Sequence, residues 1–214
     1  QILPIEEEHF AGVLTGSLVE KNWKDQPQKV DFFVMKGILE GLFAEYGLIE
    51  KVTFVSDNQR EGMHPGRTAA LYLGDKEIGF AGQIHPLAAK AYDLDETYAF
   101  EVNLQAIVEA DKEPTIYGAI PKFPGMTRDI AMLVDEAITN QQLVDLIYKK
   151  GGKNLVSVRL FDIYQGKNIE DGKKSMAYTL SYLNPTATMV EEEVSKAFDK
   201  VTNALVEEYQ VVVR

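Results

Sequence analysis

The order of strand-like and helix-like patterns over residues 128–213 constrains the fold most strongly. Strands are predicted at 128–134, 155–165, 173–183 and 211–213. Between them lie two amphipathic helices that start at Thr139 and Thr188. Each threonine is followed three residues later by Gln142 or Glu191, which is the signature of a capping box. The order β-α-β-β-α-β is typical of a ferredoxin-like fold, whose two helices cover one face of a four-stranded sheet and leave the other open.

Alternation along these strands predicts which side chains lie under the helices, because successive strand residues point to opposite faces. The covered side is expected to hold the large apolar residues Ile130, Met132, Val134, Phe161, Ile163, Met176, Tyr178, Leu180 and Tyr182. The open side is expected to hold Ala131, Asp162, Tyr164, Ser175, Ala177 and Thr179. Residues 156–160 have the opposite pattern, and a β-bulge in this strand would reverse the parity there.

The predicted open face has the composition of a stacking site. Small residues surround one aromatic ring, Tyr164, so a flat ring has room to stack on it. Stacking of a base on an aromatic side chain contributes about 1–3 kcal/mol. Asp162 can accept hydrogen bonds from a base edge, and Ser175 can donate or accept them. An ordinary solvated sheet face is the alternative that the residues alone leave open.

The first half of the chain is predicted to be α+β with a largely antiparallel sheet. A helix pattern runs from Val30 to Tyr46, and strand patterns follow at 52–55, 68–73, 78–84 and 98–102. Gly37 and Gly41 lie on one face of the helix, where we expect close packing within this module, with a partner site as the alternative. Residues 111–125 contain several prolines and glycines without periodicity, so we expect two domains, 1–117 and 118–214.

The net charge of −11 at first argues against a nucleic-acid partner. However, residues 1–121 carry −10 of it and residues 122–214 only −1, while residues 149–174 carry a local charge of +4. An RNA partner for the second half therefore stays possible on charge grounds.

Composition also limits the chemistry and the cellular location that we expect. The chain has no cysteine, and its three histidines lack metal-ligand spacing, so no metal site is predicted. It contains neither the phosphate-loop motif Gly-x-x-x-x-Gly-Lys-Ser/Thr nor the nucleophile motif Gly-x-Ser-x-Gly, so no catalytic residue is predicted. No apolar run reaches the roughly 20 residues that span a bilayer, so we expect no membrane partner and a cytoplasmic location. The chain starts at Gln1 rather than Met, so we expect a fragment of a longer protein.

Several short motifs of the chain resemble one protein family. In the second half they are Phe123-Pro124, Arg128-Asp129-Ile130-Ala131, the run from Leu160 to Gly166, Gly172-Lys173-Lys174-Ser175 and Arg214. They resemble the ferredoxin-fold anticodon-binding domain of bacterial phenylalanyl-tRNA synthetase β subunits. In the first half, residues 31–37, 63–67 and 79–86 resemble the preceding catalytic-like domain of that subunit, a class II synthetase-like antiparallel sheet domain.

The resemblance implies a non-catalytic part of a tRNA ligase. In that family the separate α subunit binds ATP and phenylalanine, so this fragment alone is expected to be inactive and to hold no cofactor, while the holoenzyme uses ATP and Mg²⁺. The implied partners are tRNA-Phe and the α subunit in an α2β2 assembly. Asp162 and Tyr164 would contact the first anticodon base, and Ala131, Ser175 and Ala177 would shape the pocket beside it. The alternative function is a ferredoxin-like regulatory module that binds a small ligand or a protein.

Overall fold

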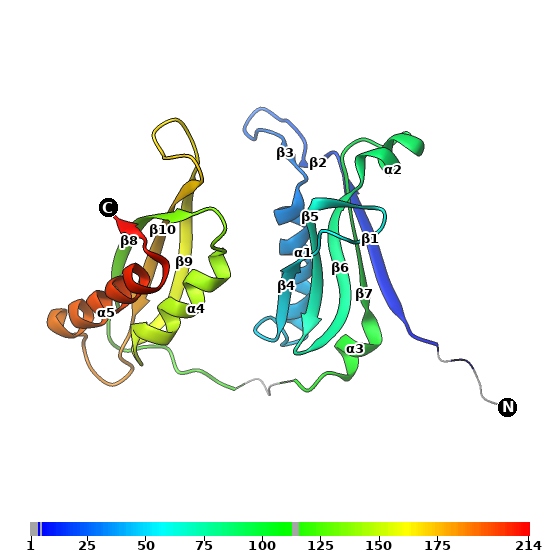
Figure 1. Ribbon diagram of the computed structural model, residues 1–214. Helices are drawn as coiled ribbons and strands as arrows, with labels where there is room; N and C mark the ends of the chain where they lie inside the picture. The colour runs from blue at the N-terminus through cyan, green and yellow to red at the C-terminus, as the bar shows by residue number, and fades with distance from the viewer. Residues whose placement is uncertain (1–3, 5, 113–115) are drawn as a thin grey trace. The chain divides into compact units, whose positions relative to one another are not determined.

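The computed structural model describes residues 4, 6–112 and 116–214. The chain divides into two compact units, Gln1–Ile116 and Tyr117–Arg214 (Figure 1). Each unit has its own apolar core.

The first unit is built on a five-stranded antiparallel sheet. Its strand order is β1 (His9–Thr15), β7 (Thr97–Asn103), β6 (Lys76–Ile84), β5 (Met63–Leu73) and β4 (Val52–Ser56). Helix α1 (Phe32–Glu45) buries Met35, Leu39 and Phe43 in the core of this unit. The short elements β2 (Ser17–Val19), β3 (Gln28–Lys29), α2 (Pro86–Ala91) and α3 (Leu104–Glu109) complete the unit. The predicted antiparallel α+β architecture is confirmed.

The expected role of Gly37 and Gly41 is wrong. Both glycines are exposed on α1, and a β-carbon on either would meet no described atom within 4 Å. The buried side of α1 is instead formed by Met35, Leu39 and Phe43, which recur every four residues. The two glycines therefore do not serve close packing within the described part of this unit.

The second unit has the predicted β-α-β-β-α-β order. Its antiparallel sheet runs β11 (Val212–Val213), β8 (Met126–Asp135), β10 (Lys173–Tyr182) and β9 (Leu155–Tyr164). Helices α4 (Asn140–Gly151) and α5 (Glu191–Tyr209) lie on the same side of this sheet (Figure 1). The core between them contains alternate residues of β8 and β10, such as Met132 and Tyr178, together with Ile147 and Leu205 of the helices.

Only one of the two predicted capping boxes is present. Thr139 caps α4, because its hydroxyl accepts from the Gln142 amide while the Gln142 side chain accepts from the Thr139 amide. Helix α5 instead starts after Val190 and has no side-chain cap. Glu191, Glu192 and Glu193 fill its first turn, where negative charge stabilises the helix dipole.

Two irregularities in β9 produce the predicted parity reversal. Asp162 pairs with Ala177 but Leu160 pairs with Tyr178, so Phe161 is left out of the register, and Val156 is left out in the same way further back. As a result, Val158 and Leu160 pack against the core, while Arg159, opposite Thr179, turns to the open side. The bulge that the parity required is therefore confirmed at Phe161.

The expected burial of Phe161 and Ile163 under the helices is wrong, although Ile163 lies on the expected face, opposite the core residue Met176. Their exposed fractions are 50% and 52%, respectively. Phe161 occupies the bulge, and Ile163 follows it on β9, which is the edge strand of the sheet. An edge strand has a neighbour on one side only, so it receives less cover than a central strand.

Candidate functional site

The open face of the second unit, on the side of the sheet away from α4 and α5, brings the predicted site residues together. The pairing of β8 with β10 and of β10 with β9 arranges them in rows across the sheet. The first row contains Leu133, Ser175 and Tyr164, and the second contains Ala131, Ala177 and Asp162. Since adjacent strands lie about 4.8 Å apart, these residues form one continuous patch.

The patch combines an exposed aromatic ring with a flat surface of small side chains, which we call its floor. Tyr164 is 46% exposed at the end of β9, whereas Ala177 on the central strand β10 is only 8% exposed. Ala131 and Ala177 carry only methyl groups, so nothing in the second row rises above the sheet except Asp162, which is exposed. The arrangement can hold a flat ring against Tyr164 with a carboxylate acceptor at its edge.

Gly166 fixes the space available to the Tyr164 ring. A β-carbon at Gly166 would lie 2.5 Å from the tyrosine oxygen and 2.7 Å from Cζ. The ring therefore lies over the backbone of residue 166, which limits its freedom on that side.

The loop after Tyr164 is tied to the turn that follows β8. Gln165 Nε2 donates to Glu136 Oε1 over 2.6 Å, and Lys174 Nζ donates to the Glu136 carbonyl over 3.1 Å. Within the loop, Lys173 Nζ lies 2.6 Å from Glu170 Oε2, and this hydrogen bond and charge lower the pKa of Glu170. These contacts hold the start of β10 and the end of β9 next to the patch.

A third row extends the open face away from Tyr164. It consists of Asp129, Thr179 and Arg159, and the Thr179 hydroxyl donates to Asp129 Oδ1 over 2.7 Å. Beyond it, Ser181 of β10 is flanked by Thr127 and Ser157. These two rows are polar and contain no aromatic residue.

The positive charge of residues 149–174 does not gather in one place. Lys149 and Lys150 form the last turn of α4, which covers the other face of the sheet. Arg159 lies on the open face, while Lys167 and Lys173 belong to the loop and strand start beside Tyr164. Only part of the +4 segment can therefore act on the patch.

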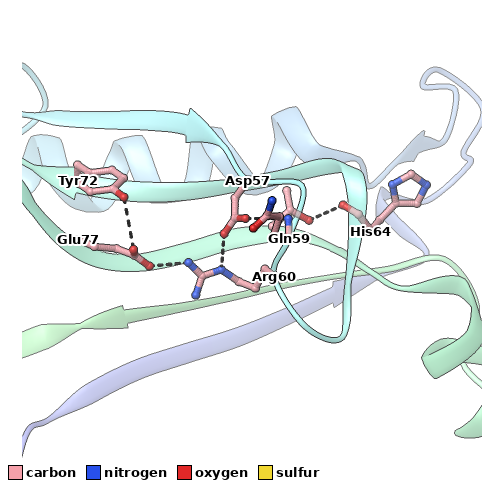
Figure 2. Close-up of polar contacts among 7 residues, drawn as sticks. Asp57, Gln59, Arg60, His64, Tyr72 and Glu77 are labelled. Atoms are coloured by element: carbon pink, nitrogen blue, oxygen red, sulfur yellow. Dashed lines mark hydrogen bonds and ion pairs between the residues drawn. The ribbon is translucent and has the colours of Figure 1, made fainter.

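The first unit contains a separate polar cluster around Arg60, shown in Figure 2. Arg60 donates to Asp57 Oδ2 over 2.8 Å and to Glu77 Oε1 over 2.5 Å, and its guanidinium lies 4.8 Å from the centre of the Phe80 ring. The amide of Gln59 and the charge of Arg60 lower the pKa of Asp57. Because two carboxylates already engage the guanidinium, the cluster holds the β4–β5 loop and offers no free reactive group.

The motif His64-Pro65-Gly66-Arg67 also has a structural role. It lies where the pairing of β5 with β6 shifts between Met63 and Thr68. His64 Nδ1 accepts from the Gly66 amide over 3.0 Å, and the Thr68 hydroxyl donates to the His64 carbonyl over 2.7 Å. From the sequence, this motif is expected to form a rigid turn ahead of a strand; the structure instead places it within β5, as an irregular stretch of that strand.

Residues 4, 6–112 and 116–214 contain no group of three or more His, Asp or Glu side chains suited to a metal ion. None of the helices in this part of the chain is long and apolar enough to cross a bilayer.

Comparison with known proteins identifies both units. Residues 1–104 match the family described as "Phenylalanyl tRNA synthetase beta chain CLM domain", and residues 121–214 match "Ferredoxin-fold anticodon binding domain". The two units thus define a subunit of the aminoacyl-tRNA synthetase class with an anticodon-binding domain. The chain belongs to the family of phenylalanine–tRNA ligase beta subunits.

Curated relatives support this assignment over the whole chain. The chain is 47% identical over 214 residues to the phenylalanine–tRNA ligase beta subunit of Lactiplantibacillus plantarum and 50% identical over 214 residues to that of Latilactobacillus sakei. It is 46% identical over 211 residues to that of Bacillus subtilis. These matches include 99–100% of the chain but only 26–27% of each relative, so the chain spans about a quarter of the relatives' length. The alternative of a regulatory module finds no support in these matches.

Two residues of the open face were missed as site candidates. Leu133 completes the row of Ser175 and Tyr164, and its parity with Ala131 in the sequence could have identified it. Arg159 faces the open side only because of the bulge at Phe161. Its location therefore depends on the pairing of β9 with β10.

Proposed function

We propose that the second unit binds the anticodon of tRNA-Phe on its open face, as part of a phenylalanine–tRNA ligase. The observation that carries this proposal is the placement of Tyr164 and Asp162 on one edge strand beside the floor of Ala131 and Ala177. The first anticodon base would stack on Tyr164, and Asp162 would accept a hydrogen bond from its edge. Ser175, next to Tyr164, would supply a further donor or acceptor.

The first unit would serve as a scaffold for the catalytic α subunit. This role is supported by the family match and by the Arg60 cluster, whose charged groups are engaged with one another. We place the functional division at residues 1–117 and 118–214, near the division of the chain into two compact units. The holoenzyme would be a cytoplasmic α2β2 assembly that uses ATP and Mg²⁺ at a site outside this chain.

Binding of an anticodon stem-loop of tRNA-Phe tests the proposal. We expect Tyr164→Ala to weaken binding of the 214-residue chain by about 1–3 kcal/mol, the value of one stacked base, and Tyr164→Phe to retain most of it. Tyr92→Ala is the control, since Tyr92 is also exposed but belongs to the first unit, at the end of α2. Equal losses in the two alanine variants, or no loss in either, would show that the open face does not bind the anticodon.

A further inference from the structure

We propose that Arg159 binds a backbone phosphate of the RNA strand whose base stacks on Tyr164. This inference rests on the proposed function and extends it to the third row of the open face, Asp129, Thr179 and Arg159. It assigns one face of the sheet two tasks, base recognition near Tyr164 and backbone contact near Arg159.

Arg159 is available for a ligand. It is exposed on the open face, and the described part of the chain gives it no ion pair and no hydrogen bond to another side chain. Two acids flank it on the open face: Asp129, two strands away, already accepts the Thr179 hydroxyl, and Asp162, in the neighbouring row of β9, forms no ion pair with Arg159 in the described structure. The positive charge of Arg159 is therefore not neutralised by a direct partner on its own row.

Two of the lysines near Tyr164 are less suited to this task. Lys173 lies 2.6 Å from Glu170, and Lys174 donates to the carbonyl of Glu136. Both are held in the contacts that fix the loop between β9 and β10. Compared with these two lysines, Arg159 has a guanidinium that is less engaged with other residues.

The separation of Arg159 from Tyr164 favours a neighbouring nucleotide. Their partners on β10, Thr179 and Ser175, are four residues apart, which corresponds to about 14 Å at about 3.4 Å per residue. This is the separation of the backbone positions, and it spans more than the row on which a base would stack. The Arg159 side chain, on the third row, would instead meet the sugar-phosphate chain that continues across the sheet.

The chemistry of the third row suits a phosphate better than a base. The guanidinium of arginine matches phosphate geometry through two parallel hydrogen bonds. The hydroxyl groups of Ser157 and Ser181, in the neighbouring row, can donate to phosphate or ribose oxygens, while the Thr179 hydroxyl already donates to Asp129. Neither of these two rows contains an aromatic side chain on which a base could stack.

The salt dependence of binding tests the proposal, because each phosphate contact contributes to the slope of log affinity against log salt concentration. With the 214-residue chain and the tRNA-Phe anticodon stem-loop, we expect Arg159→Gln to make this slope shallower by about 0.7. Affinity should fall several-fold, and by the same factor for a stem-loop whose first anticodon base is changed. Arg159→Lys should keep the slope and lose part of the affinity.

Lys200→Ala is the charge-matched control, since Lys200 is exposed on α5, on the other side of the sheet. An unchanged slope in Arg159→Gln, or an equal change in Lys200→Ala, would overturn the assignment of Arg159. If Tyr164→Ala still weakens binding in that case, anticodon binding stands and only the phosphate contact fails. If the unaltered chain does not bind the stem-loop, both proposals fail.

Discussion

The ring of Tyr164 occupies the space that a side chain at residue 166 would need, and residue 166 is glycine. A β-carbon at residue 166 would lie 2.5 Å from the Tyr164 oxygen, and the backbone of Gly166 is not in the positive-φ region that requires glycine. The glycine is thus needed for the space that the ring occupies. The position of the proposed stacking ring depends on a residue that carries no functional group of its own.

Replacing Gly166 by alanine should therefore impair RNA binding more than stability. We expect Gly166→Ala to displace the Tyr164 ring and to weaken binding of the anticodon stem-loop several-fold. The free energy of unfolding should change by no more than about 0.5 kcal/mol, as for other surface substitutions. Gly118→Ala is the control, because a β-carbon there meets no described atom within 4 Å. Unchanged RNA affinity in Gly166→Ala would show that the ring position does not matter.

Two buried tyrosines of β10 should respond oppositely to loss of their hydroxyl groups. Tyr178 donates to Asn140 Oδ1 over 2.8 Å, whereas the Tyr182 hydroxyl is buried without a hydrogen-bond partner among the described residues. We expect Tyr178→Phe to lower the free energy of unfolding by about 1 kcal/mol and Tyr182→Phe to leave it unchanged or raise it. Urea unfolding of both variants measures this difference, and a larger loss in Tyr182→Phe would contradict it.

Tyr98 should make the first unit sensitive to alkaline pH. Burial, together with the 2.6 Å hydrogen bond to Glu96, raises the pKa of Tyr98 to about 12 from its ordinary value of 10.0. Because the unfolded chain loses this proton at lower pH than the folded one, stability is fully present below pH about 10 and falls as the pH rises towards about 12. Tyr98→Phe should reduce this pH dependence in urea unfolding measured across that range, and an unchanged slope would contradict the assignment.

Arg60 should control the order of the β4–β5 loop in the first unit. It connects Asp57 with Glu77 (Figure 2), and its guanidinium lies over the Phe80 ring. We expect Arg60→Ala to cost about 1 kcal/mol and to speed amide hydrogen exchange at residues 57–62. Lys76→Ala is a charge-matched control at the start of β6. Exchange that is unchanged in Arg60→Ala would show that the loop is held by other contacts.

For the two central strands, the sequence predicted which residues face each side of the sheet, because both strands are regular and covered on one side only. In β8 and β10 the large apolar residues alternate without interruption, so Ala131, Ser175 and Ala177 could be placed on the open face from the sequence. In these strands the local pattern and the tertiary structure agree.

The edge strand β9 and helix α1 were less predictable. The sequence of β9 required a bulge, but its position at Phe161 follows from the register with β10, which is a tertiary property. The exposure of Phe161 and Ile163 has the same origin. For Gly37 and Gly41, the sequence pattern could not tell an exposed helix face from a buried one, because glycine adds no hydrophobic signal.

Mapping the RNA contact by NMR tests the central claim most directly. The 214-residue chain would be titrated with the tRNA-Phe anticodon stem-loop while amide chemical shifts are followed. We predict that the largest changes cluster on the open face, at Ala131, Asp162, Tyr164, Ser175 and Ala177, with smaller ones near Arg159. Changes confined to α4 and α5 or to the first unit would contradict the account, because they would place the RNA away from the Tyr164 patch.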